Sequence, residues 1–215
     1  MAKAGAMTAA LRLVLLCALV AQLAAPAPVL AQGVPDATAV DNPSTAGAEL
    51  KRLFDEDQAE RTPVPGKVTD WAAVMLRDEA RQRRVKELIT SGSVSSGSDY
   101  YHAAMVMQHA TEPDDYLLAH DLCVVAISKG EQQAKWLAAA SLDRFLVSIG
   151  RPQRFGTQFS SNHPSRPPRL RPVDPSVPDQ LRRELNVPTL AQAKARELKM
   201  ASDSTRAKPQ DGAEK

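Results

Sequence analysis

Residues 99–159 read DYYHAAMVMQHATEPDDYLLAHDLCVVAISKGEQQAKWLAAASLDRFLVSIGRPQRFGTQF. Apolar residues recur in this stretch at helical spacing, and Pro113 and Gly130 divide it into three segments. Gly150 and Pro152 then end the last segment before a polar turn. The stretch therefore predicts three consecutive helices. Because the turns between them are short, neighbouring helices should pack antiparallel.

The same spacing predicts helices on both sides of this stretch. They are expected at about 44–61, 68–89, 175–185 and 189–200. Ser98 or Asp99 should cap the helix that opens the central stretch. We predict an all-α fold, a compact antiparallel helical bundle of about five core helices followed by one or two short C-terminal helices. Aromatic residues make up only 4% of the chain, so its core should consist of Ala, Leu, Val and Met.

A segment rich in proline and arginine joins the two groups of helices. Residues 151–173 contain five arginines, five prolines and no acidic residue. Proline cannot donate a backbone hydrogen bond, so we expect no regular structure here. The segment should be extended, cationic and wrapped around the bundle.

The first 31 residues have the composition of a secretory signal peptide. Two basic residues precede an uncharged run at 13–25, and Val-Leu-Ala at 29–31 offers a cleavage site. An uncleaved amphipathic anchor is the alternative, but the apolar run is short for a membrane span. We predict an exported protein, periplasmic or secreted, that begins at Gln32 and has no membrane attachment after cleavage.

Cleavage would also change the charge and the cysteine content. Losing Lys3 and Arg12 takes the formal charge from +2 to 0, which does not support nucleic-acid binding through overall charge. Cys17 would be lost too, so Cys123 would remain alone and no intramolecular disulfide could form. After the cleavage site we predict a flexible leader at 32–43, a single helical domain at 44–201 and a disordered tail at 202–215.

Asp143 is the polar residue that the pattern singles out first. Its helical neighbours three and four positions away are all apolar, so its carboxylate should face the core. A buried carboxylate needs a cation or backbone N–H donors to offset its desolvation. Asp143 therefore either anchors the next turn or an arginine, or it serves as the carboxylate of a functional site.

The turn after this helix carries Gln153, Gly156, Thr157 and Gln158. Gly156 permits a positive φ, while the two amides and the hydroxyl provide donors and acceptors. Such a turn could bind a ligand or could satisfy buried helix ends.

Gln108 and His109 close the first helix of the central stretch. A histidine there is either a cap, charged with the help of the helix dipole, or a general base. The residues His102, His120 and Cys123 could meet at a metal, but they form no compact ligand motif, so we predict no metal and no cofactor.

Several of these residues lie within short motifs. The motifs are Asp57-Gln58 with Arg61, Asp78, Gln108-His109, Asp143-Arg144, the run 150–159, Pro172-Val173-Asp174-Pro175 and Leu185-Asn186-Val187-Pro188. With these motifs the chain resembles an uncharacterised bacterial family, a domain of unknown function, over about residues 50–200. The resemblance implies a helical domain with a recurrent set of polar residues and no established activity. The serine-rich loop at 91–99 departs from the family pattern.

These observations favour an exported helical binding or interaction domain with a polar cleft near Gln153–Gln158. Its partner is expected to be a protein or a small polar ligand. The alternative is a hydrolase that uses His109 or Asp143 as general acid or base. The sequence decides neither the ligand nor the oligomeric state.

Overall fold

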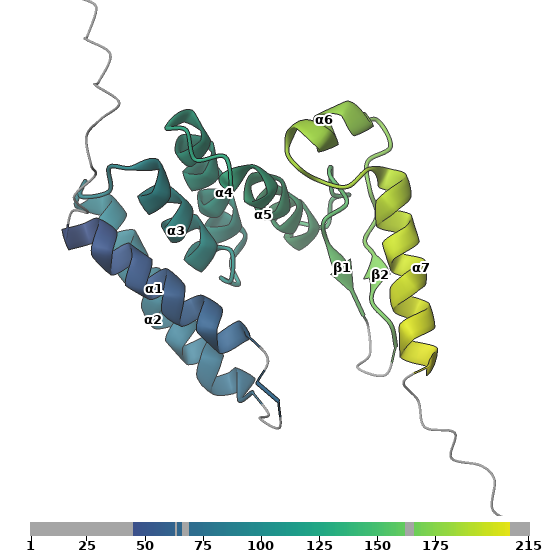
Figure 1. The fold of residues 1–215 in the computed structure, drawn as a ribbon, viewed down its shortest axis with the longest axis horizontal. Coiled ribbons are helices and arrows are strands. Elements are labelled where there is room, and N and C mark those ends of the chain that lie inside the picture. The colour runs from purple at the N-terminus through teal and green to yellow at the C-terminus, as the bar shows by residue number, and fades with distance from the viewer. Residues whose placement is uncertain (1–44, 63, 66–68, 162–165, 207–215) are drawn as a thin grey trace, which may run out of the picture. The chain divides into compact units, whose positions relative to one another are not determined.

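The computed structural model describes residues 45–62, 64–65, 69–161 and 166–206, all within one compact unit at 42–215. This part of the chain contains seven helices and one two-stranded antiparallel sheet (Figure 1). The elements are α1 (Thr45–Arg61), α2 (Trp71–Thr90), α3 (Gly97–Met107), α4 (Pro113–Ser128), α5 (Ala134–Ser148), β1 (Phe159–Ser160), β2 (Arg169–Leu170), α6 (Asp179–Glu184) and α7 (Leu190–Arg206). The predicted all-α class is confirmed. The predicted signal and leader, 1–43, lie outside the described residues.

The first five helices share one apolar core. Helix α1 contacts α2 and α3, α3 contacts α4, and α4 contacts α5 (Figure 1). Each contributes a side chain with at most 1% exposure, namely Leu50, Val85, Met107, Cys123 and Leu137 in that order. Aliphatic and sulfur-containing side chains therefore fill the bundle, as the low aromatic content predicts.

Several helices begin at other residues than predicted, and α6, expected from about residue 175, begins at Asp179. Ser96 caps α3, because its hydroxyl accepts from Asp99 N–H at 3.1 Å while the Asp99 carboxylate accepts from Ser96 N–H at 3.0 Å. This reciprocal capping box puts Asp99 inside the first turn, so the prediction of Ser98 or Asp99 as the cap is wrong. Asp70 caps α2 by accepting from Ala73 N–H at 3.1 Å, and the helix starts after the predicted position.

Helix α5 also starts later than its predicted position, Glu131. Gly130 has φ +94°, and Glu131 N–H donates to the carbonyl of Ala126 at 2.9 Å. This glycine turn satisfies a carbonyl at the end of α4 and reverses the chain. The next helix begins only at Ala134.

The proline- and arginine-rich segment contains regular structure, contrary to the prediction. Phe159 pairs with Leu170 and Ser160 with Arg169 in the β1–β2 sheet. Nearer its ends, Gln153 N–H donates to the Pro172 carbonyl at 2.9 Å. The prolines of the described part lie outside both strands, so they do not interrupt the pairing.

A second, smaller core supports the C-terminal elements. Ala139 on α5 packs with Phe155, Val177 and Val187, which come from the segments around the sheet and α6. Helix α7 packs against β2 (Figure 1) and extends to Arg206. The predicted disorder from residue 202 is therefore wrong for residues 202–206.

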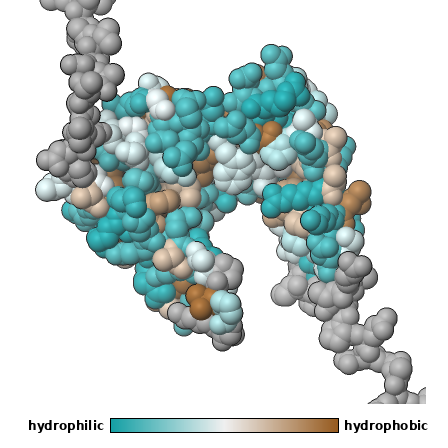
Figure 2. Space-filling model, viewed as in Figure 1, coloured by the Kyte–Doolittle hydropathy of each residue, from teal (hydrophilic) through white to brown (hydrophobic). Residues whose placement is uncertain are grey.

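On the face drawn in Figure 2, hydrophilic residues predominate over the described helices. Every helix in the described ranges is too short or too polar to cross a lipid bilayer. Four of the larger exposed apolar side chains gather near one end of α2, on Val64, Trp71, Met75 and Leu76.

Candidate functional site

The candidate residues form two groups that meet at one hydrogen bond. The first, here called the ion network, joins α1, α2 and the end of α3. It contains Asp57, Gln58, Asp78 and His109 together with Glu60, Arg61 and Arg81. The second, the Asp143 turn, contains Asp143, Gln153, Gly156, Thr157 and Gln158. Arg144 connects them, since its Nη1 donates to Gln108 Oε1 at 2.9 Å.

Arg61 is at the centre of the ion network. Its guanidinium lies 2.8 Å from Asp57 Oδ1 and 2.6 Å from Asp78 Oδ2. Arg81 continues the network, with Nη2 2.7 Å from Asp78 and 2.9 Å from Glu60. These contacts join α1 to α2 through alternating charges, which an isolated sequence motif cannot reveal.

The two central carboxylates of the network differ in pKa. Burial raises the pKa of Asp57 to about 6, against the lowering effects of Arg61 and Gln58. Burial also acts to raise the pKa of Asp78, but hydrogen bonds from Arg61 and Arg81 outweigh it and hold that pKa below its usual value. Asp57 Oδ1 has no well-directed hydrogen bond within the described part, so its ion pair with Arg61 offsets its burial only partly.

His109 lies against this network as a neutral imidazole. Its Nε2 is 3.6 Å from Asp57 Oδ2, too far for a hydrogen bond, and has no other bonding partner among the described residues. Burial, with the positive charges of Arg61 and Arg144, lowers the pKa of His109 to about 3. The expectation of a charged cap is therefore wrong, because desolvation outweighs the helix dipole.

Asp143 is held by backbone donors. Its carboxylate is fully buried and accepts from the N–H groups of Arg154, Phe155 and Thr157 at 2.7, 3.0 and 3.0 Å. The hydroxyl of Thr157 adds a bond of 2.8 Å. Of the two partners that the sequence left open, the turn is correct and the arginine side chain is not. Asp143 thus fixes the backbone that follows α5.

Gln153 and Gln158 complete the same turn. The Gln153 side chain is fully buried, donates to the carbonyls of Gln158 and Arg171 at 3.0 and 2.9 Å, and accepts from Gln158 N–H at 2.8 Å. Gln158 Nε2 donates to the Ala140 carbonyl at 3.2 Å. Gly156 has φ +81°, a left-handed conformation that closes the turn. Most of the predicted cleft is therefore a satisfied hydrogen-bond network.

Arg182 is a structural member of this turn that the sequence reasoning missed. It is 1% exposed, and its guanidinium donates to the carbonyls of Arg154, Phe155 and Val177 at 2.9, 3.2 and 2.6 Å. A buried arginine that binds carbonyls holds α6 onto the turn. The Arg-Arg pair at 182–183 gave no local signal of which side chain would be buried.

Two of the candidate residues, Arg144 and Gln158, line a cavity of about 230 Å³, here called the Arg144 cavity. Its other walls come from α4, α5, β1 and the residue after β2. These are Tyr116, Val147, Ser148, Phe159, Ser160 and Arg171. Within the described part of the chain, Arg144 makes one hydrogen bond, to Gln108, and no ion pair with a carboxylate. Most of its five N–H donors thus stay available at the cavity.

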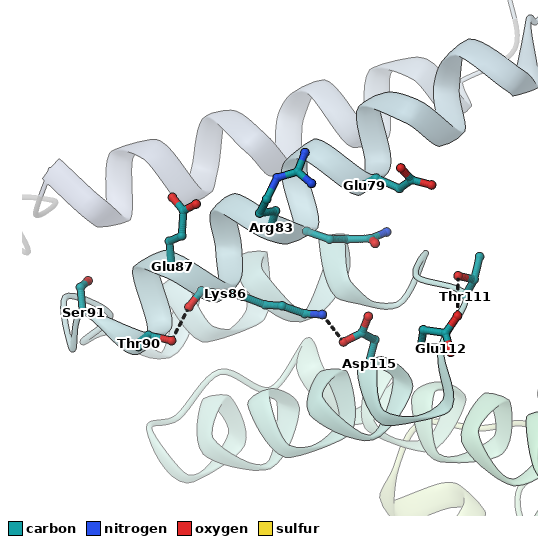
Figure 3. A pocket seen from close by; sticks show the side chains of 10 residues that line it. Glu79, Arg83, Lys86, Glu87, Thr90, Ser91, Thr111, Glu112 and Asp115 are labelled. Atoms are coloured by element: carbon teal, nitrogen blue, oxygen red, sulfur yellow. Dashed lines mark hydrogen bonds and ion pairs between the residues drawn. The ribbon is translucent and has the colours of Figure 1, made fainter.

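A larger groove of about 800 Å³ lies between α2 and the start of α4 (Figure 3). Its described lining includes four acidic and two basic residues, and Lys86 bridges to Asp115 at 2.5 Å. None of the candidate residues lines it. Its charged groups are solvated or paired, so the groove gives less reason to expect a bound polar ligand than the Arg144 cavity.

The histidines and cysteine considered for a metal lie in other environments. His120 Nδ1 is 2.9 Å from the Ala138 carbonyl, His102 stacks on Phe54, and burial raises the pKa of Cys123 to about 12. Within the described ranges, no group of three or more His, Cys, Asp or Glu side chains is arranged to hold a metal ion.

Comparison with known proteins adds no relative. No family model matches the chain, and no curated protein or solved structure is significantly similar to it. The resemblance to an uncharacterised bacterial family stays a prediction.

Proposed function

We propose that this chain is an exported helical binding protein that holds a small polar ligand in the Arg144 cavity. The observation that carries the proposal is that two candidate residues, Arg144 and Gln158 of the Asp143 turn, line one cavity. The lining residues of the cavity carry guanidinium, amide, phenol and hydroxyl groups around a small volume. A few converging polar groups in a pocket are typical of small-molecule sites.

The groups around the cavity are held in place by the fold. Gln158 is fixed by Ala140 and by Gln153, while Gln108 holds one edge of the Arg144 guanidinium. The Asp143 turn orders the backbone between α5 and β1. Such preorganisation lowers the entropy cost of binding, which supports a ligand site.

The hydrolase alternative has less support. The acceptors of Asp143 are occupied by backbone N–H groups and Thr157, so this carboxylate has little capacity to take a substrate proton. His109 lies beside Asp57 and Arg61, with no serine, threonine or cysteine bonded to it among the described residues. A general base needs a proton to remove within hydrogen-bond reach.

Export rests on the sequence of the first 31 residues, which lie outside the described part. N-terminal sequencing of the protein recovered from a bacterial periplasm or medium should begin at Gln32. A cytoplasmic product that retains Met1 would contradict export without touching the binding proposal.

Ligand binding is tested by thermal shift against a panel of small sugars, amides, amines, carboxylates and phosphates. A ligand that binds only the folded state should raise the unfolding midpoint. Val147→Phe should fill the cavity and remove that shift, whereas Val124→Phe, at an exposed position on α4, should keep it. The proposal fails if no compound shifts the parent, or if Val147→Phe shifts like Val124→Phe.

A further inference from the structure

We infer that the Arg144 cavity binds an oxyanion, the carboxylate or phosphate group of a small molecule, between the guanidinium groups of Arg144 and Arg171. This inference rests on the proposed function and names the chemistry of its ligand. The cavity is lined by both arginines, and within the described part of the chain no carboxylate lies within 4 Å of either guanidinium.

The unused donors of the two arginines point to an acceptor-rich ligand. Arg144 Nη1 donates to Gln108, and the other N–H groups of Arg144 have no hydrogen-bond acceptor among the described residues. Arg171 Nε is buried and lacks a hydrogen-bond partner among the described residues. A buried unsatisfied donor is costly, and an oxyanion would satisfy several such donors at once.

The charge of the site favours an anion over a neutral or cationic ligand. The eight lining residues include two arginines and no acid. Two acidic residues adjoin lining residues in the sequence: Asp143 has its oxygens engaged by the turn, and Asp115 pairs with Lys86. Burial lowers the pKa of Arg144, but a guanidinium stays charged at every pH of interest. A bound oxyanion would relieve the repulsion between two cations in a partly dehydrated space.

The remaining walls define the size and shape of the ligand. The phenol of Tyr116 and the hydroxyl of Ser160 offer further donors, while Val147 and Phe159 provide apolar contact. The Ser148 hydroxyl already donates to the Phe145 carbonyl at 2.7 Å. The volume of the cavity, about 230 Å³, lies below the usual range for drug-sized ligand pockets. The cavity therefore suits a short mono- or dicarboxylate or a small phosphorylated molecule.

The test is calorimetric titration of the purified full-length chain with acetate, succinate and inorganic phosphate, at ionic strength held constant with sodium chloride. Acetamide and succinamide are the neutral matches. At least one anion should bind, with its neutral match at least tenfold weaker, and comparison of carboxylates with phosphate identifies the oxyanion. Binding should shift the Arg144 and Arg171 Nε–Hε NMR signals.

Three variants complete the test. Arg144→Gln and Arg171→Gln should each weaken anion binding by about tenfold or more, as expected for a lost charge-assisted bond. Arg183→Gln removes an equal charge at an exposed position of α6 and should change affinity less than twofold. If Arg144→Gln does not fold, Arg171→Gln decides. A neutral ligand that binds as tightly and is lost in Val147→Phe would overturn the inference and leave the proposed function standing. Absence of anion binding would overturn the inference, and absence of binding by every compound of the thermal-shift panel as well would overturn both.

Discussion

Two fully buried carboxylates, Asp57 and Asp143, are satisfied in different ways. Asp57 lies in the ion network beside Arg61, His109 and Gln58. Asp143 has four backbone and hydroxyl donors from one turn. Burial raises the pKa of Asp57 to about 6 against the lowering effect of Arg61, so its environment can respond to pH. Asp143 instead depends on the local backbone, because three of its four donors are N–H groups of the turn at 154–157.

The largest effect is expected from Asp143→Asn. The new amide NH₂ would face backbone N–H groups. At least one of these N–H donors would then point at another donor and lose its acceptor. We expect a loss of unfolding free energy on the order of 3 kcal/mol. Urea denaturation should show a lower midpoint with an unchanged slope. Asp121→Asn, at an exposed position of α4, is the control and should stay within about 0.5 kcal/mol of the parent. An Asp143→Asn protein as stable as the parent would contradict the structural role of this carboxylate.

Arg61→Gln tests the other side of the comparison. It leaves the buried Asp57 without its main cation. Because the Arg61 side chain is itself partly exposed, we expect a loss of unfolding free energy on the order of 2 kcal/mol at pH 7.5. Without Arg61 the folded pKa of Asp57 should rise above about 6. A folded pKa above the unfolded one makes stability fall as pH rises through it. The loss caused by Arg61→Gln should therefore shrink at pH 5. Urea midpoints at both pH values measure this, and equal losses at both would show that Asp57 takes up no proton.

His109→Gln should change the acid side of the stability profile. The folded pKa of His109, about 3, lies below its unfolded value, so its stabilising contribution falls as pH drops below about 6.5. Between pH 6.5 and 5 the parent should lose about 1.5 kcal/mol of unfolding free energy through His109 alone. The variant should not show this loss. Asp57 acts in the opposite direction over this range in both proteins, so the difference between their profiles reports the imidazole. Parallel profiles would mean that His109 titrates normally.

The sequence predicted the helical elements well where local signals suffice. Apolar spacing, Pro113 and Gly130 located the central helices because helix periodicity and helix-ending residues are local properties. The cap of α3 was misplaced by two residues because several serines and Asp99 compete in one loop. The β1–β2 pair was missed because two-residue strands have no periodicity to read.

The candidate site was less predictable, for a physical reason. The apolar surroundings of Asp143 correctly predicted burial and the need for donors, but backbone N–H groups of a turn leave no residue-type signature. Arg144 was named among the candidates, yet its cavity depends on Arg171, more than 20 positions later, and on Tyr116 of α4. Such convergence is set by tertiary packing, and a single sequence does not report it. Arg182 was missed for the same reason.

The smallest effect compares Gly156→Ala in the Asp143 turn with Gly130→Ala after α4. Both glycines have positive φ, so each substitution should cost about 1 kcal/mol from backbone strain alone. A Cβ on Gly156 would meet Ala193 Cβ at 3.6 Å and Val173 Cγ2 at 3.8 Å, ordinary contacts, and one on Gly130 would meet nothing within 4 Å. Because neither new Cβ would clash, we expect both variants to lose the same unfolding free energy in urea denaturation. If Gly156→Ala costs clearly more, the strained backbone has moved Thr157 N–H away from Asp143, and the turn is a cooperative unit. If the losses are equal, the turn tolerates local strain, and the Asp143→Asn loss measures the carboxylate alone.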